Sequence, residues 1–383
     1  MLQDFSSEEI QRYSRHLMIP EIGLEGQRKL KNSSVLMVGA GGLGSPIGLY
    51  LAAAGVGHIG IVDYDRVEIS NLQRQVMHGT STVGEFKVES ARQRMLDINP
   101  TIHIDTFPVP FTSENALDIA AGYQILVDGT DNFPTRYLVN DLCVLTGRPF
   151  IYGAVYRFEG QASVFDSRIG PCYRCILPQP PPPGVTPGCS EVGVFGAMPG
   201  LVGLIQATEV IKLILGIGET LTGKLMLLDA LTSSFRTIQI KKNPACNICG
   251  DDPQITYLMD YTEFCGVPFP GSHAVSENLS EITPCELASR LANGDHIRLI
   301  DVRQSVEQQI SNLPGAELIP FETLAGEFGR FSPEDQIVLF CRTGNRSLRA
   351  QQLLHEAGFQ HVWNLRGGIN AWAREVDPTM TQY

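Results

Sequence analysis

The chain has 383 residues, of which 43% are hydrophobic and 18% charged, and its formal net charge is -12 at pH 7. A chain of this size can bury a core and form two or three domains. The negative charge and the lack of a long basic run argue against nucleic-acid binding. Residues 1–9 are polar and acidic, and no stretch approaches the roughly 20 apolar residues of a membrane-spanning helix. We therefore expect a cytoplasmic protein that does not enter a membrane.

From residue 35 onward, apolar runs of strand length alternate with amphipathic helical stretches, which is the pattern of βαβ units around a parallel sheet. Strands are expected at 35–38, 59–63, 102–107, 125–128, 150–155, 161–165, 225–228 and 235–240. Helices are expected at 46–55, 85–98, 114–121 and, as a long buried helix, 200–215. The sequence thus predicts a first α/β domain that is Rossmann-like and contains a mixed sheet.

Two segments rich in proline and glycine interrupt this pattern. Residues 178–189 can form neither a helix nor a central strand, so we expect a loop there. Residues 251–280 have the composition of a linker between domains. A second, smaller α/β pattern then follows, with strands at 298–302, 337–341 and 362–365. The expected boundaries are 1–250 for the first domain, 251–280 for the linker and 281–378 for the second domain.

A nucleotide-binding fingerprint lies at the start of the first domain. Gly39, Gly41 and Gly44 fit the GxGxxG pattern between a predicted strand and a predicted helix. Asp63 ends the next strand about 20 residues later, where a ribose-binding carboxylate would lie. This pattern fits NAD as well as ATP. Taken alone it favours an NAD-dependent oxidoreductase over an ATP-dependent enzyme, because the fingerprint is commonest in dinucleotide dehydrogenases.

Polar residues further along favour chemistry at phosphates. Ser70-Asn71-Leu72-Gln73-Arg74 lies in a loop, Lys87 begins a helix, and Asp131-Asn132 follows a later strand. Arginine and lysine neutralise charge that develops on phosphates, and an aspartate can hold Mg²⁺. Each cation alone could be an ordinary solvated surface charge. Hydride transfer requires none of them, so the combination favours nucleotidyl transfer.

Four of the nine cysteines form two CxxC pairs, Cys172 with Cys175 and Cys246 with Cys249. Together they supply the tetrahedral set of four thiolates that suits Zn²⁺. Such a closed site leaves no position for water, which predicts a structural metal. A redox dithiol is the alternative, but it would not call for two matched pairs.

The first domain resembles the MoeB/ThiF superfamily, the bacterial relatives of ubiquitin-activating enzymes. The resemblance covers residues 1 to about 250, and the motifs that carry it are Arg12-Tyr13-Ser14-Arg15-His16, the Gly39–Gly44 loop, Asp63, residues 70–74, Lys87 and Asp131-Asn132. It implies adenylation of the C-terminal glycine of a ubiquitin-like sulfur carrier that ends in Gly-Gly.

The same resemblance implies roles for particular residues. Gly42 and Asp63 would contact ATP, three side chains would hold the phosphates, and Asp131 would bind Mg²⁺. The three phosphate-binding residues are Asn71, Arg74 and Lys87. The zinc would be structural, and a homodimer would form in which Arg15 reaches the partner's site. Cys189 would be a thioester or acyl-disulfide partner, although an incidental exposed cysteine is the alternative.

Residues from about 280 to 378 resemble a rhodanese domain. Cys341 follows a predicted buried strand and precedes a predicted helix, so backbone N–H groups converge on its sulfur and stabilise a thiolate. Related cysteine loops serve sulfur transfer through a persulfide or phosphate-ester hydrolysis. The six residues from Cys341 to Arg346 suit one sulfur atom, whereas the phosphatases carry a longer loop. Arg342 and Arg346 would balance the anionic persulfide.

Together, the two domains resemble bacterial MoeB–rhodanese fusions and predict an adenylyltransferase and sulfurtransferase. The sulfur donor would be a cysteine desulfurase or thiosulfate. Pathways to molybdopterin, cysteine, thiamine, thiolated tRNA and secondary metabolites all use such proteins. An NAD-dependent oxidoreductase fused to a rhodanese, and a non-enzymatic scaffold that merely carries sulfur, are the alternatives.

Overall fold

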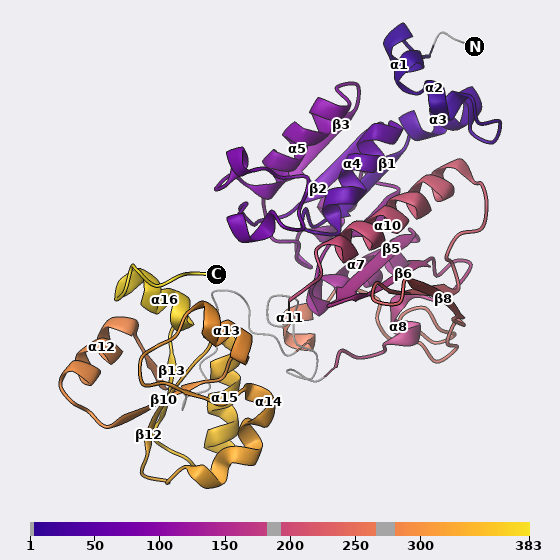
Figure 1. Cartoon of the computed structure of the whole chain (residues 1–383). Helices are drawn as coiled ribbons and strands as arrows, with labels where there is room; N and C mark the ends of the chain where they lie inside the picture. Colours follow the sequence, from indigo (N-terminus) through magenta and orange to yellow (C-terminus); the bar gives the residue numbers. More distant parts are fainter. Residues whose placement is uncertain (1–3, 182–192, 266–279) are drawn as a thin grey trace. The chain divides into compact units, whose positions relative to one another are not determined.

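The computed structural model describes residues 4–181, 193–265 and 280–383 (Figure 1). The chain divides into two compact units, Met1–Pro268 and Phe269–Tyr383. Cys189 lies outside the described residues. Each unit has its own sheet and its own hydrophobic core, and each is described by itself.

An eight-stranded mixed sheet forms the centre of the first unit, in the order β3-β2-β1-β4-β5-β6-β7-β8. The strands are β1 Ser34–Val38, β2 His58–Val62, β3 His103–Phe107, β4 Ile125–Asp128, β5 Phe150–Tyr156, β6 Glu159–Phe165, β7 Lys224–Asp229 and β8 Ser234–Gln239. Strands β1 to β5 are parallel, and β6 to β8 continue the sheet antiparallel. The expected Rossmann-like mixed sheet is confirmed.

Helices cover both faces of this sheet (Figure 1). They are α1 Ser7–Arg12, α2 Ser14–Leu17, α3 Gly23–Lys31, α4 Gly44–Ala54, α5 Lys87–Ile98, α6 Ala116–Ala120, α7 Phe133–Thr146, α8 Tyr173–Ile176, α10 Ala197–Leu215 and α11 Tyr261–Phe264. Alternate residues of β1 enter opposite cores: Val35 packs with α4, α5 and α10, whereas Leu36 packs with α6 and α7. A strand that is apolar on both sides therefore lies at the centre of three layers.

Helix α10 is long and apolar enough to cross a membrane, judged by length and composition alone. In the structure it packs against α4, β5 and β6. Val202 and Val210 are fully buried in the core that α10 shares with α4. These contacts make α10 a core helix of the first unit, as the sequence predicts for 200–215.

The described part of the expected 251–280 linker packs on the first unit. Helix α11 contacts α7, and Tyr261 and Cys265 are buried in the same core as Tyr137 of α7. The Tyr261 hydroxyl also donates a hydrogen bond to Asp141 at 2.8 Å. The proline and glycine content of residues 251–280 suggests a spacer. Buried side chains nevertheless hold the described part of this segment against the first unit. Residues 266–279 lie outside the described residues.

The second unit is built on a five-stranded parallel sheet in the order β11-β10-β12-β13-β9. The strands are β9 Ser280–Ile282, β10 Ile297–Asp301, β11 Glu317–Leu318, β12 Gln336–Phe340 and β13 Val362–Leu365. The helices are α12 Pro284–Ala292, α13 Ser305–Ile310, α14 Phe321–Leu324, α15 Asn345–Glu356 and α16 Gly368–Glu375. Strand β12 lies in the middle of the sheet and is buried on both faces, which places the residue after it, Cys341, at the end of a rigid element.

Candidate active sites

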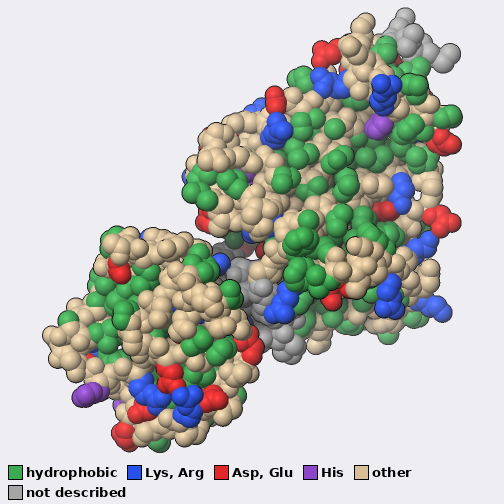
Figure 2. Space-filling view, in the orientation of Figure 1, with side chains coloured by type: hydrophobic (Ala, Val, Ile, Leu, Met, Phe, Trp, Pro, Cys, Tyr) green, Lys and Arg blue, Asp and Glu red, His purple; other side chains and the backbone are tan. Residues whose placement is uncertain are grey.

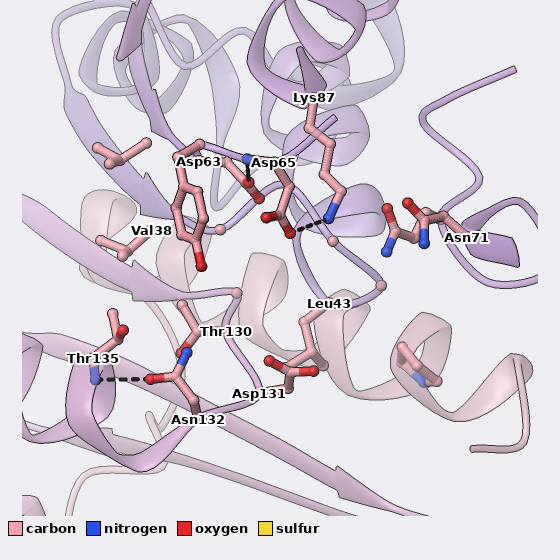
Figure 3. A pocket seen from close by; sticks show the side chains of 18 of the residues that line it. Val38, Leu43, Asp63, Asp65, Asn71, Lys87, Thr130, Asp131, Asn132 and Thr135 are labelled. Carbon is pink, nitrogen blue, oxygen red and sulfur yellow. Dashed lines mark hydrogen bonds and ion pairs between the residues drawn. The ribbon is translucent and has the colours of Figure 1, made fainter. Parts of the chain in front are cut away.

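A pocket of about 280 Å³ lies at the carboxyl ends of β1, β2 and β4 (Figure 3). This is the edge at which ligands bind in doubly wound sheets. Among the described residues, nine of those singled out in the sequence line it: Gly39, Gly41, Gly42, Asp63, Asn71, Arg74, Lys87, Asp131 and Asn132. These nine residues come from segments that lie up to about ninety residues apart in the sequence, and the pocket brings them together.

The glycine turn between β1 and α4 is held by close backbone contacts. Gly39 has φ +100°, and a Cβ there would lie 2.7 Å from the carbonyl oxygen of Gly129. A Cβ on Gly44 would clash with the carbonyl of Gly39. Gly44 does not line the pocket, so it serves the packing of α4 against the turn. Gly39, Gly41 and Gly42 are the glycines of this turn that line the pocket.

Asp63, which follows β2, fixes this turn. Its two carboxylate oxygens accept hydrogen bonds from the backbone N–H groups of Ala40 at 2.8 Å and Asp65 at 2.9 Å. Burial raises the pKa of the Asp63 carboxyl, and the positive charge of Lys87 opposes that shift. The carboxylate is thus positioned at the rim where a ribose would bind.

Lys87, at the start of α5, is tethered to the same edge. Its Nζ lies 2.7 Å from Oδ2 of Asp65, and its backbone N–H donates to the Asp65 carbonyl at 2.9 Å (Figure 3). The Lys87 side chain is only 8% exposed, whereas that of Asp65 is 50% exposed. The pair therefore holds a buried cation beside the pocket, where it can face a phosphate.

Two of the five side chains in the 70–74 segment reach the pocket. Asn71 accepts a hydrogen bond from the Glu68 N–H at 3.1 Å, and Arg74 donates to the Ser70 carbonyl at 3.1 Å. Ser70, Leu72 and Gln73 are not among the described lining residues. The segment includes a 3₁₀ helix at Ile69–Asn71, so successive side chains point in different directions.

The loop after β4 contributes the remaining acidic group. Asp128, the last residue of β4, is fully buried and accepts hydrogen bonds from Thr130 and from Arg136 Nε at 3.1 Å. Asn132 caps α7 by accepting from the Thr135 N–H at 2.9 Å. Asp131 stands between these two fixed residues and is exposed to the pocket (Figure 3). An exposed carboxylate in this place fits a hard cation such as Mg²⁺.

Arg15 lies elsewhere in the described part of the first unit. It is on α2, is exposed, and is not among the residues that line the pocket. If Arg15 acts at a nucleotide site, that site must therefore belong to another subunit.

The four CxxC cysteines form one compact cluster. The Sγ atoms of Cys172 and Cys246 are 3.6 Å apart, those of Cys175 and Cys249 are 3.4 Å apart, and those of the first CxxC pair are 3.9 Å apart. Tetrahedral zinc with Zn–S bonds of about 2.3 Å requires sulfurs about 3.8 Å apart. The cluster fits that ion, and because three of the four cysteines are buried it has little access to water.

Cys341 lies in a cradle of hydrogen-bond donors between β12 and α15. Its Sγ accepts from the Gly344 N–H at 3.1 Å and from the Ser347 hydroxyl at 3.4 Å. The carbonyls of Cys341 and Arg342 accept in turn from the N–H groups of Ile369 and Asn370. Donors aimed at the sulfur stabilise an anionic thiolate or persulfide there.

The two arginines of this loop have different surroundings. Arg346 Nη1 donates to Oε2 of Glu307 at 2.8 Å. The guanidinium of Arg342 lies 5.9 Å from the ring centroid of Tyr383. The sequence predicts that both balance the sulfur anion, and the structure adds a carboxylate and an aromatic ring that hold them.

The ThiF family model matches residues 13–248, and a rhodanese-like domain model matches residues 283–375. The chain belongs to the ThiF family and carries a rhodanese-like domain. This confirms the resemblance expected from the motifs in both halves of the sequence.

Curated relatives span nearly the whole chain. A probable adenylyltransferase/sulfurtransferase MoeZ of Mycobacterium tuberculosis is 49% identical over 384 residues, covering 99% of this chain and 96% of the relative. An adenylyltransferase and sulfurtransferase MOCS3 of Culex quinquefasciatus is 42% identical, covering 99% and 90%. A sulfur carrier protein adenylyltransferase of Thermus thermophilus is 51% identical, covering 69% of this chain and 99% of its own length.

Solved structures agree on the fold of the first unit. E. coli MccB with AMPCPP and MccA superposes with a TM-score of 0.57 at 24% identity, covering 64% of this chain and 76% of that one. At this identity the likeness concerns the fold alone, and it matches the mixed α/β architecture described above.

Several residues of this ThiF-family pocket carry no signal in the sequence motifs. Val109, Phe111 and Pro199 add an apolar wall suited to a base, and they come from the segment after β3 and from α10. Buried His78 bonds to the Ala40 carbonyl at 2.8 Å and so supports the glycine turn from behind. Asp65 could have been found from the run Asp63-Tyr64-Asp65, whereas the others lie outside any motif.

Proposed function

We propose that the protein adenylates the C-terminal glycine of a ubiquitin-like sulfur carrier and then transfers sulfur to it from Cys341. The observation that carries this proposal is the pocket that brings Arg74, Lys87 and Asp131 to the glycine turn. The names of the relatives that span the whole chain support both activities.

In the first step, the carrier carboxylate attacks the α-phosphate of ATP, an acyl-adenylate forms, and pyrophosphate leaves. Asn71, Arg74 and Lys87 would hold the phosphates and offset the charge that develops on them. Asp131 would hold Mg²⁺, which when bound neutralises phosphate charge. Asp63 would accept hydrogen bonds from the ribose. Positioning and charge neutralisation suffice for this step, so it requires no protein nucleophile.

In the second step, a persulfide on Cys341 attacks the activated carbonyl and displaces AMP, which gives an acyl disulfide. The thiolate of Cys189, as the proposed resolving group, then attacks the Cys341 sulfur and releases the carrier thiocarboxylate. This leaves a Cys189–Cys341 disulfide, which an external thiol reduces. Gly344 and Ser347 would stabilise the persulfide, as they contact the sulfur in the structure. A cysteine desulfurase or thiosulfate would reload it.

We further propose a structural zinc at the four-cysteine cluster, a cytoplasmic location and a homodimer. One face of the first unit exposes large apolar side chains, and Figure 2 shows hydrophobic side chains gathered there around α10. They are Met18, Ile19, Tyr50, Leu201 and Leu204. Helix α10 packs against α3 and α4, so this surface adjoins the α2 helix that carries Arg15. A second copy packed on this surface would lie beside the helix that carries Arg15.

Carrier-dependent exchange of pyrophosphate into ATP tests the adenylation step. Arg74→Ala and Asp131→Ala should each lower the exchange rate at least about a hundredfold, because each removes a charge that the phosphates require. Arg94→Ala, which removes an exposed arginine of α5, is the matched control and should leave exchange unchanged. NADH turnover without exchange would overturn the proposal in favour of an oxidoreductase. Carrier binding with neither activity would indicate a scaffold.

A further inference from the structure

Tyr383 lies within the polar network that surrounds the Cys341 loop. Its hydroxyl accepts a hydrogen bond from Arg303 Nη1 at 2.7 Å and lies 3.3 Å from Oε1 of Glu307, to which it donates. Burial raises the pKa of Tyr383 to about 12, so the hydroxyl keeps the proton that it donates. The hydroxyl therefore links a buried arginine to a carboxylate.

That carboxylate also holds the last residue of the cysteine loop. Oε2 of Glu307 accepts from Arg346 Nη1 and from the N–H of Gln304, at 2.8 and 2.9 Å. The side chains of Glu307 and Arg346 are 14% and 9% exposed. Tyr383 and Arg346 thus share one largely buried carboxylate, and a shift of the tyrosine hydroxyl would be transmitted to the arginine.

A second set of contacts reaches the beginning of the loop. Asn370 of α16 donates from its side chain to the Tyr383 carbonyl at 2.9 Å, and its backbone N–H donates to the Arg342 carbonyl at 3.1 Å. The Tyr383 ring lies 5.9 Å from the Arg342 guanidinium, within reach of a cation–π interaction. Tyr383 therefore contacts Glu307, which binds Arg346, and Asn370, which binds the backbone of Arg342.

The other end of the network is anchored in the sheet. Arg303 is fully buried and forms an ion pair at 2.7 Å with Asp301, the last residue of β10. Strand β10 pairs directly with β12, which leads into Cys341. The tyrosine hydroxyl is consequently fixed relative to the strand that positions the sulfur.

We propose that Tyr383 is a positioning residue of the sulfur-transfer site, which holds Arg342 and Arg346 in the orientation that receives an anionic sulfur group at Cys341. This inference rests on the proposed function of Cys341. Tyr383 also packs against the core beside α16, so a purely structural role is the competing explanation.

Alkylation of Cys341 in the full chain separates these explanations. Mass spectrometry would measure the ratio of its reaction rates with iodoacetate, an anion, and iodoacetamide, its neutral counterpart. Tyr383→Phe keeps the ring and removes the hydroxyl, and we expect the ratio to fall about fivefold, which corresponds to the loss of one typical hydrogen bond. Met380→Ala is the matched control, because Met380 packs against the same core without touching the network.

An unchanged ratio in Tyr383→Phe, or an equal fall in Met380→Ala, would overturn the inference. Glu307→Gln by itself should also lower the ratio. The double variant with Tyr383→Phe should lower it little further, because both substitutions act on Arg346. Additive losses would contradict the inference that Tyr383 acts on Arg346 through Glu307. In transfer of sulfur from thiosulfate to cyanide, Tyr383→Phe should raise KM for thiosulfate about fivefold with little change in kcat. If neither thiosulfate nor a cysteine desulfurase loaded sulfur onto Cys341 of the unmodified chain, the proposed function would fail, while the alkylation ratio would still decide the role of Tyr383.

Discussion

The nucleotide pocket and the cysteine loop are built in different ways. The pocket is assembled from the ends of three strands and from side chains that lie far apart in the chain, including Asp63, Lys87 and Asp131. The cysteine loop is one run of six residues, closed by hydrogen bonds from Ile369 and Asn370. The first site thus depends on the whole of its unit, and the second on one strand and its immediate supports.

The two units nevertheless share one feature, a buried aspartate with an arginine partner at the end of a strand. Asp128 ends β4 and Asp301 ends β10, and each is fully buried with an arginine partner. Each also accepts a backbone N–H from the residue two positions later. A buried carboxylate that binds the following loop fixes where that loop begins. The two units thereby position unrelated chemistry by the same physical means.

Loss of the proposed zinc should have the largest effect and should fall on the first unit alone. Removing a structural zinc from four thiolates costs on the order of 10 kcal/mol, which is comparable to the whole stability of an ordinary domain. Both tryptophans, Trp363 and Trp372, lie in the second unit, so their fluorescence reports on that unit only. Chelation or Cys246→Ser should abolish pyrophosphate exchange and part of the circular dichroism signal while the tryptophan transition stays in place.

Cys285→Ser removes an exposed cysteine outside the cluster and should behave like the unaltered protein. A folded, active preparation that repeatedly contains no zinc would refute the structural metal.

The buried aspartates give a smaller and matched effect in the two units. Asp128→Asn and Asp301→Asn each leave an arginine without its counter-charge, which costs about 3–5 kcal/mol in the free energy of unfolding. In denaturant titrations, Asp301→Asn should shift the tryptophan transition and Asp128→Asn should leave it unchanged. Asp97→Asn, at a surface carboxylate that is 72% exposed, is the control. If Asp128→Asn shifted the tryptophan transition equally, the two units would not unfold independently.

The smallest expected effect is on the pH dependence of the free energy of unfolding, and it concerns only the first unit, which contains the nucleotide pocket. Burial lowers the pKa of His78 from its ordinary 6.5, so the folded chain keeps this imidazole neutral where the unfolded chain protonates it. The unfolded state then binds more protons, and the free energy of unfolding of the first unit falls as the pH drops below about 6.5. His78→Gln should flatten this dependence, and a curve parallel to that of the unaltered protein would contradict the assignment.

The sequence predicts each site to the extent that its contacts are local. The run from Cys341 to Arg346 is contiguous, so its strand, turn and helix follow from neighbouring residues. In the pocket, glycine spacing predicts the turn but cannot separate Gly41, which faces the ligand space, from Gly44, which packs α4. Phe111 lines the pocket and His78 supports its glycine turn through tertiary folding alone, and no spacing rule connects either residue to the glycines.

The central claim is that adenylation and sulfur transfer occur at two sites, which a single substitution can separate. Cys341→Ala removes the sulfur nucleophile and leaves every residue of the nucleotide pocket in place. With carrier, MgATP and a sulfur donor that supports thiocarboxylate formation by the unaltered protein, mass spectrometry of the variant should detect carrier adenylate but no thiocarboxylate, and pyrophosphate exchange should be normal. A folded Cys341→Ala protein that lost both activities, or that still formed thiocarboxylate, would contradict the account.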